Sequence, residues 1–365
     1  MKQRFLKHKA KHIWLLADLC LLAAFWLFKE NRQLMTMLAE NITIPFRQAL
    51  GKISYLVDFS VMEVICVALV IVVPIYVVCQ GVAIVRARGC RKERAYGAML
   101  LTGCLAMTAW VGLCFFLGID SYADGFQEKS GIYAEPVAPE ELLEVTLYFT
   151  ENLTEAAEKV NRDKDGGFSV PREVILAGST QAYAWVDEEF PFLAFDDPGV
   201  KPIRFSRVMS ALDFTGMYCP FTGESNVNMD SPACLLASTV SHELAHQRGV
   251  TSEQEANFLA ILAATTCGDD TYAYAGWLSG YINLSNAVYR ISPELYRTLW
   301  SMLPESVQED LRRQSDYWDQ FRDKTPQKVS NQVYDSFLKG YNQELGIQSY
   351  GTVVDLLVAY YKDQI

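Results

Sequence analysis

The stretch from Val240 to Phe258 reads VSHELAHQRGVTSEQEANF and contains the pattern His-Glu-x-x-His. Residues four apart lie on the same face of an α-helix, so His242 and His246 can bind one ion through their imidazole rings. Glu243 lies beside them, where it can act on a metal-bound water rather than on the metal. This spacing predicts a zinc site with Glu243 as its catalytic base, and one further protein ligand is needed to complete it.

Histidine is scarce in this chain, which makes the motif more informative. Only four histidines occur in 365 residues, and His8 and His12 lie in a basic N-terminal tail. The motif therefore contains both of the remaining histidines. The alternative is a pair of solvated histidines on a helix surface, and the scarcity favours a metal site over it.

The residues after the motif predict where the third ligand comes from. Gly249 is placed to end the first helix in a left-handed conformation. The sequence SEQE from Ser252 to Glu255 fits a capping box, in which Ser252 caps a second helix and Glu255 reaches back to the backbone N–H of the cap. That assignment leaves Glu253 as the favoured ligand. Glu255 is the competing ligand, because it lies deeper along an antiparallel second helix.

A site of two histidines and one glutamate keeps an open coordination position, as catalytic zinc sites do. Glu243 would take a proton from the attacking water and deliver it to the leaving amine. A second group must stabilise the oxyanion, and the domain has no further histidine for that role. Tyr281 and Tyr350 are candidates by residue type, and ordinary packing tyrosines are the alternative interpretation.

The segment from Lys201 to Asp230 is rich in Phe, Val, Tyr and Thr, with Gly and Pro between them, which predicts short strands. An extended peptide substrate can add to an exposed strand edge. Asn226 and Asn228 alternate onto one face and can bond a substrate backbone; turn-capping asparagines are the alternative.

Three apolar runs precede the polar part of the chain, at residues 13–28, 59–85 and 97–119. Each approaches or exceeds the roughly 20 residues that a helix needs to cross hydrocarbon. No small-residue cleavage site follows the first run, which indicates an uncleaved anchor. Lys and Arg are concentrated in the N-terminal tail and between the second and third runs, which predicts a multi-pass protein of the cytoplasmic membrane with a cytoplasmic N-terminus. Everything after the third run is then expected outside the cytoplasm.

Charge and composition divide the chain in the same way. Residues 1–118 carry a formal charge of +8, against −19 for the remainder, and so acidic a domain excludes a nucleic-acid partner. We expect a membrane region at 1–119, a linker at 120–138 and an extracytoplasmic domain at 139–365. Helices, then short strands, then more helices make that domain α+β and mainly helical. Its three cysteines, Cys219, Cys234 and Cys267, indicate no disulfide framework.

The segments GMYCPFTGESNVN, SHELAHQRG and EQEANF, with the three apolar runs, resemble the bacterial membrane-anchored family catalogued as domain of unknown function 3810. The resemblance covers nearly the whole chain. That family is similar to zincin metallopeptidases of the gluzincin kind, whose third ligand is a glutamate followed four residues later by Asp or a substitute. Glu253 and Asn257 match this pattern, so the resemblance implies Glu253 as ligand and Asn257 as a partner that orients a histidine. The interval between motif and glutamate is shorter here than in many gluzincins.

These patterns favour a zinc-dependent endopeptidase, tethered to the lipid bilayer by three spans, that cleaves peptide or protein substrates. The alternative is a non-catalytic, zinc-stabilised receptor or scaffold, in which Glu243 would be dispensable. Intramembrane proteolysis is disfavoured, because the apolar residues around PACLLASTVSHELAH are too few to form a span.

Overall fold

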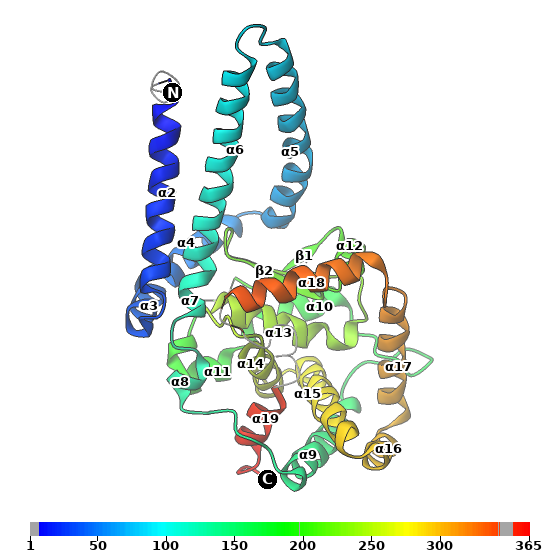
Figure 1. Ribbon diagram of the computed structural model, residues 1–365. Helices are drawn as coiled ribbons and strands as arrows, with labels where there is room; N and C mark the ends of the chain where they lie inside the picture. Colours follow the sequence, from blue (N-terminus) through cyan, green and yellow to red (C-terminus); the bar gives the residue numbers. More distant parts are fainter. Residues whose placement is uncertain (1–6, 197, 342, 344–352) are drawn as a thin grey trace. The chain divides into compact units, whose positions relative to one another are not determined.

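The computed structural model describes residues 7–196, 198–341, 343 and 353–365, and its internal contacts divide the chain into two units (Figure 1). Unit 1 comprises Met1–Pro45 and Val61–Ala123, and unit 2 comprises Phe46–Ser60 and Asp124–Ile365. The sequence predicted a membrane region at 1–119, a linker at 120–138 and a separate domain at 139–365. The structure differs, because Phe46–Ser60, the second part of the stretch between the first two apolar helices, belongs to unit 2.

Unit 1 is helical and contains the three apolar helices that the sequence predicted. Among the described residues, the helical stretches long and apolar enough to cross a membrane are Lys9–Phe28, Val61–Arg86 and Arg91–Ser130, and the last of these runs past the end of unit 1 at Ala123. The named elements of the unit are α2 (Lys9–Phe28), α3 (Arg32–Leu38), the π-helical turn η1 (Ala39–Thr43), α5 (Val61–Arg86), α6 (Arg91–Leu113), the π-helical turn η2 (Cys114–Gly118) and α7 (Ile119–Ser121).

Asp18 is an acidic residue within the first apolar helix, and the structure explains how it is accommodated. It is buried, and its carboxylate accepts a hydrogen bond from the Thr108 hydroxyl of α6 at 2.8 Å. The same hydroxyl accepts from the Trp14 indole N–H at 2.8 Å. The polar groups of α2 and α6 therefore satisfy one another between the helices, as polar residues inside membrane helices usually do.

Unit 2 is mainly helical around one small sheet, which confirms the predicted α+β composition; a zincin fold stays a prediction. The helix α4 (Ile44–Ser54) leads into it. Its own helical elements are α8 (Phe126–Ser130), α9 (Pro139–Ala157), α10 (Arg172–Ala177), η3 (Gly178–Gln181), α11 (Ala184–Glu189), η4 (Pro191–Leu193), α12 (Ser206–Ala211), η5 (Ala233–Leu235), α13 (Leu236–Gln247), α14 (Glu253–Thr266), α15 (Asp270–Ile291), α16 (Pro293–Met302), α17 (Glu305–Asp319), α18 (Thr325–Gly340) and α19 (Val353–Tyr361).

The sheet has three strands in the order β1 (Lys201–Ile203), β3 (Glu224–Asn228), β2 (Gly216–Cys219). β1 pairs with β3 in parallel, and β2 pairs with β3 in antiparallel register with Gly216 opposite Val227. Every residue of β3 is buried. β2 is therefore an edge strand of this sheet, and it lies in the region where the sequence predicted an exposed edge.

The core of unit 2 lies where α13, α14 and α15 pack on one another, with α9 and α19 against them. α14 supplies an almost continuous buried run that includes Phe258, Leu259, Ile261 and Leu262. A helix that is apolar on all sides belongs inside a domain. The helix that carries the His-Glu-x-x-His motif is thus held between the sheet and the most buried helix of the unit.

Candidate metal centre

The helix α13 brings the two histidines of the motif together, one turn apart. The Nε2 atoms of His242 and His246 lie 3.0 Å from each other. The Nδ1 atom of His246 lies 2.7 Å from the carbonyl oxygen of Val250. A carbonyl only accepts, so Nδ1 must carry the hydrogen and Nε2 keeps its lone pair. Nε2 is therefore the atom with which His246 can ligate a metal.

The turn after α13 brings Glu253 to the same place. Gly249 has a φ of +96°, in the left-handed region expected of a residue that ends a helix. Ser252 then caps α14, whose first residue is Glu253. The Glu253 carboxylate oxygens lie 3.3 Å from His242 Nε2 and 3.7 Å from His246 Nε2.

These three residues form a cluster with the donor set that zinc prefers. Their ligand atoms all lie within 4.8 Å of one another, and no other such group of His, Cys, Asp or Glu occurs among the described residues. Two imidazoles and one carboxylate leave a tetrahedral ion one open position.

Glu255 has a different role from the one that the sequence predicted. Its carboxylate accepts the backbone N–H groups of Phe126 at 2.9 Å and Gln127 at 3.1 Å, at the start of α8. Ser252 does accept the N–H of Glu255, at 3.4 Å. The predicted capping box is therefore confirmed for Ser252, which caps α14, and wrong for Glu255, which caps α8 about 130 residues earlier in the chain.

Two further side chains hold the cluster in place. The Tyr334 hydroxyl of α18 donates to Glu253 Oε1 at 2.5 Å. Against the opposing effect of burial, the pKa of His242 is raised mainly by the Glu253 carboxylate and in smaller part by Asn257, which occupies the position that the family resemblance implied for an orienting partner. Partners of this kind fix the orientation of metal ligands and raise their affinity. Tyr334 was not singled out from the sequence, because nothing near it in the chain points to a site 81 residues away.

Glu243 lies between the cluster and the edge strand β2. It is buried, and the N–H of Tyr218 hydrogen-bonds its carboxylate. The absence of a side chain at Gly216 makes room for it, because a Cβ there would clash with the Glu243 carboxylate. Its Oε2 atom is buried with no hydrogen-bond partner among the described residues. An unpartnered buried carboxylate oxygen beside the ligands is consistent with a site that holds a water or hydroxide.

The charges of the cluster are strongly coupled. Burial raises the pKa of Glu243 to about 8, and the Glu253 carboxylate contributes to that rise. Burial alone would also raise the pKa of Glu253, but the hydrogen bond to His242 and the charges of both histidines lower it to about 2. The two carboxyl groups therefore differ in protonation at neutral pH in the absence of a cation: Glu253 is ionised and Glu243 is mostly protonated.

The motif helix is fixed to its surroundings at several points. The Ser225 hydroxyl of β3 donates to the Glu243 carbonyl at 2.9 Å, and Gln247 Nε2 donates to the Gly223 carbonyl at 3.0 Å. On the other side, the Arg248 guanidinium pairs with Asp187 and lies 3.9 Å from the ring centroid of Tyr183. The position of Glu243 therefore depends on the β2–β3 hairpin.

Three of the remaining predicted residues, Asn226, Asn228 and Tyr281, are not brought to the cluster. Asn226 and Asn228 are buried in β3, and their amides bond groups inside the domain, including the Ser210 hydroxyl at 2.8 Å from Asn228 Nδ2. Tyr281 is buried in α15, where burial and the neighbouring Tyr296 raise its pKa. Tyr350 lies outside the described residues. All nine cysteines are free.

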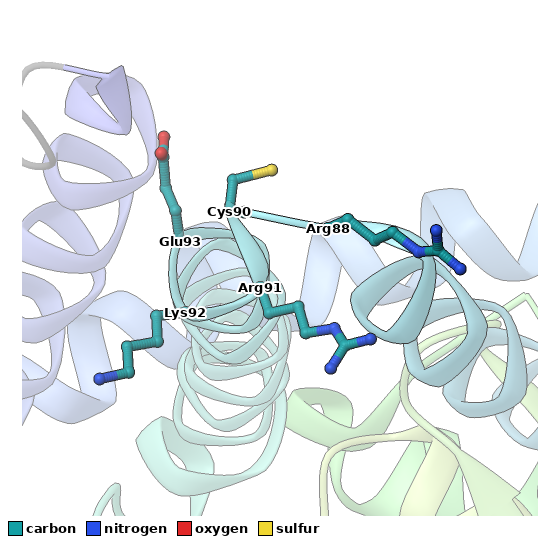
Figure 2. A pocket seen from close by; sticks show the side chains of 6 residues that line it. Arg88, Cys90, Arg91, Lys92 and Glu93 are labelled. Carbon is teal, nitrogen blue, oxygen red and sulfur yellow. The ribbon is translucent and has the colours of Figure 1, made fainter.

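Unit 1 has a pocket of its own at the turn between α5 and α6, lined by Arg88, Gly89, Cys90, Arg91, Lys92 and Glu93 (Figure 2). Figure 2 shows the Arg91 and Lys92 side chains extending to different sides of the helix. Glu93 pairs with Lys7 at 2.5 Å. This pocket is a hollow around a basic turn and has no metal-ligating cluster.

The fold and the cluster together define a protein with three candidate membrane helices and a mainly helical domain that carries a His-His-Glu candidate metal site. The chain belongs to the DUF3810 family, described as a protein of unknown function, whose model matches residues 39–358. No curated protein and no solved structure matches the chain. The match includes the whole of unit 2, with its early segment Phe46–Ser60, except for the last residues.

Proposed function

We propose that this chain is a membrane-anchored, zinc-dependent metallopeptidase with Glu243 as its general base. One observation carries the proposal: His242, His246 and Glu253 converge on one point, and a buried carboxylate lies beside them. A bound zinc ion would act as a Lewis acid and provide a water of lowered pKa. His242, His246 and Glu253 are the residues that would hold it.

The protein groups around the cluster support hydrolysis. Glu243 Oε2 has no hydrogen-bond partner among the described residues, so it is available to accept the proton of an attacking water and to return it to the leaving amine. The pKa of about 8 belongs to the site without a cation, and a nearby positive charge lowers the pKa of a carboxyl group. Glu243 would then be ionised at neutral pH, as a base must be.

The edge strand β2 supports a peptide as the substrate. Thr215 bonds Asn228 across the hairpin, so the backbone groups of Gly216 and Tyr218 alternate away from β3 and towards Glu243. An extended peptide can add to such an edge. Peptide addition at β2 replaces the predicted role of Asn226 and Asn228, which lie in the central strand.

The first experiment measures metal content in the full chain. Zinc near one per chain is expected for the wild type by elemental analysis, and Glu253→Gln is expected to lose it. Glu255→Gln is the matched control, because it lies two residues away and caps α8 instead. A wild-type chain without zinc, or equal loss in both variants, contradicts the ligand assignment.

The second experiment separates the base from the ligands. Glu243→Gln should keep the zinc and lose about 10²–10⁴-fold in the rate of cleavage of a peptide library followed by mass spectrometry. Glu309→Gln, on the surface of α17, is the control and should cleave as the wild type does. Cleavage by Glu243→Gln at the wild-type rate rules out the assigned base.

A zinc-stabilised receptor is the second candidate, and one observation favours it. The segment Phe46–Ser60 is built into unit 2 and is followed directly by the apolar helix α5, so the metal domain is joined to a candidate span on both sides. In a receptor, Glu243→Gln would leave the cellular phenotype of the protein intact. In a peptidase, the same variant would behave as a deletion.

A further inference from the structure

We propose that unit 2 lies on the surface of the bilayer through an apolar face of its own, formed by residues 46–60, α12 and α18. We call this set of residues the bilayer face. Its described, exposed large apolar members are Phe46, Ile53, Leu56, Phe59, Val208, Val329 and Val333. The proposal does not depend on whether the metal site hydrolyses peptides.

The segment 46–60 is an integral part of unit 2. The Lys201 ammonium is buried, pairs with Glu224 at 2.6 Å and donates to the carbonyl oxygens of Ser54 at 2.7 Å and Phe59 at 2.9 Å. The Ser54 hydroxyl donates to the Thr222 carbonyl at 2.8 Å. Lys201 at the start of β1 and Thr222 in the β2–β3 turn therefore hold this segment to the sheet.

The chain itself places the end of this segment at a membrane boundary. Ser60 is bonded to Val61, the first residue of α5, which is one of the three helices apolar enough to span a bilayer. One peptide bond covers about 3.8 Å between Cα atoms, so Phe59 and Ser60 cannot lie far from where that helix enters the lipid. The edge of unit 2 that holds them must lie there too.

The same segment directs its apolar side chains outward. Ile53 is 65% exposed, Leu56 81% and Phe59 57%, so none of them serves the core. Large apolar patches exposed on a protein mark sites of contact with a partner or a membrane. The covalent link to α5 selects the bilayer as the occupant of this patch.

The helix α12 extends the face on the other side of the Lys201 contacts. It follows β1 directly, and β1 begins at Lys201, whose ammonium binds the Phe59 carbonyl. Val208 of α12 is 55% exposed. Residues about 150 positions apart in the chain thus contribute apolar side chains to one region of unit 2.

The helix α18 has the pattern of a helix that lies in a membrane interface. Gln327 and Asn331 face inward and bond Asp213, which follows α12, while Val329 and Val333 lie on the outer side. The exposed Lys328 lies in its first turn, where it pairs with Asp323, and the exposed Arg322 and Lys324 lie just before the helix, where Arg322 pairs with Asp319. An outward apolar stripe with basic residues beside it fits anionic lipid headgroups.

This helix also connects the bilayer face to the metal centre. Its Tyr334 donates to Glu253, so the helix that would lie on lipid supports a ligand of the candidate metal site from its inner side. Substrates that reach the site would then be segments held close to the membrane.

Photo-cross-linking in the full chain tests the proposal. p-Benzoylphenylalanine is introduced at Val208, at Val329 or at Ile291, and the protein is reconstituted in nanodiscs of phosphatidylcholine and phosphatidylglycerol. Ile291 is the matched control, because it is 57% exposed and lies next to α16, at the opposite end of unit 2 from α12 and α18 (Figure 1). After irradiation, the lipid adduct is measured by intact mass.

The bilayer face predicts about tenfold more lipid adduct at Val208 and at Val329 than at Ile291. Equal adduct at the three positions overturns the proposal, and so does cross-linking at Val208 and Val329 mainly to a second copy of the chain. A second variant keeps the test independent of one probe. Val329→Asp with Val333→Asp should reduce the adduct at Val208 while Ile291→Asp leaves it unchanged, and an unchanged adduct in the double variant also contradicts the proposal.

Discussion

Tyr334 is the residue that most changes the description of the candidate metal centre. It lies in α18, and its hydroxyl donates to the same carboxylate oxygen, Glu253 Oε1, that faces His246. A carboxylate that accepts a hydrogen bond from a fixed donor has fewer orientations open to it. The hydroxyl therefore restricts the orientation of the Glu253 carboxylate beside the two histidines.

Removal of this hydroxyl should weaken metal binding. For Tyr334→Phe we expect zinc affinity to fall by about 10–100-fold, because loss of a partner that orients a ligand has that effect. Competition with a zinc chelator measures the change. Tyr289→Phe, at an exposed tyrosine, is the control, and equal affinities in the two variants contradict the orienting role.

At the residue scale the sequence supplied the motif but not its surroundings. The four-residue spacing of His242 and His246 indicates a shared helix face, and Gly249 has the φ that its position predicts. The sequence left Glu253 and Glu255 in competition, because either glutamate fits a turn after Gly249. The choice between them depends on the backbone N–H groups of α8, which bind Glu255 and so remove it from the candidate ligands. No local sequence pattern carries information about a contact so distant in the chain.

At the scale of elements, the β2–β3 hairpin links the segment 46–60 to the motif helix. Gly223 in its turn has a φ of +68°, and its carbonyl accepts from Gln247 of α13. A Cβ at Gly223 would clash with the backbone of Arg47 and Gly51 in α4. Gly223 thus contacts both helices that pack against the hairpin, α4 and α13.

The substitution Gly223→Ala should destabilise unit 2 by at least about 2 kcal/mol, because it adds left-handed strain to a clash with backbone atoms that cannot rotate away. Thermal unfolding of the full chain measures this. Gly340→Ala is the control, since a Cβ there meets nothing within 4 Å, and it should leave the unfolding temperature close to that of the wild type. A stable Gly223→Ala protein would mean that α4 does not pack against the turn.

The Lys201–Glu224 pair makes a second prediction for the same elements. Both side chains are almost fully buried, so Lys201→Met leaves an uncompensated carboxylate inside the domain. We expect a loss of about 3–5 kcal/mol of unfolding free energy. Lys159→Met, which breaks an exposed pair in α9, should change the unfolding temperature little. Similar shifts in the two variants would show that Lys201 is hydrated rather than buried.

Several elements were predictable because their signals are local. Ser292 accepts the N–H of Leu295 and Pro293 begins α16, as a serine followed by proline predicts. The apolar runs gave three helices; the bounds of the first two, Lys9–Phe28 and Val61–Arg86, lie within a few residues of the prediction, whereas the third, Arg91–Ser130, extends beyond the predicted 97–119 at both ends. Residues 124–138, expected as a linker, belong to unit 2, because Glu255 binds the start of α8 and Phe126 is buried among aromatic rings.

At the scale of the whole molecule, the division of the chain is the feature that the sequence did not predict. The segment 46–60 has no motif, and it lies between two apolar helices. It belongs to unit 2 through Lys201 and Thr222, which follow about 150 residues later. Hydropathy separates membrane helices from polar stretches, but it carries no information about which polar stretch packs where.

A fragment that starts at Asp124 should therefore be incomplete. Without residues 46–60 it leaves the Lys201 ammonium without two of its acceptors and the Gly223 turn uncovered. A synthetic peptide of residues 46–60 should bind this fragment and raise its unfolding temperature. The matched control is the same peptide with Gly51→Val, because Gly51 packs against the Gly223 carbonyl. No shift with the native peptide, or the same shift with both, argues against the assignment of this segment to unit 2.

The place of Ser54 in unit 2 also sets an order of events during synthesis. The ribosome completes Ser54 well before Thr222, its hydrogen-bond partner 168 residues later. At the usual rates of elongation this interval lasts roughly 10–30 s. During that time the first helices are made while the segment between them has no sheet to pack against. Unit 2 can therefore complete its folding only after β2 and β3 have been synthesised and have packed against residues 46–60, which were made much earlier.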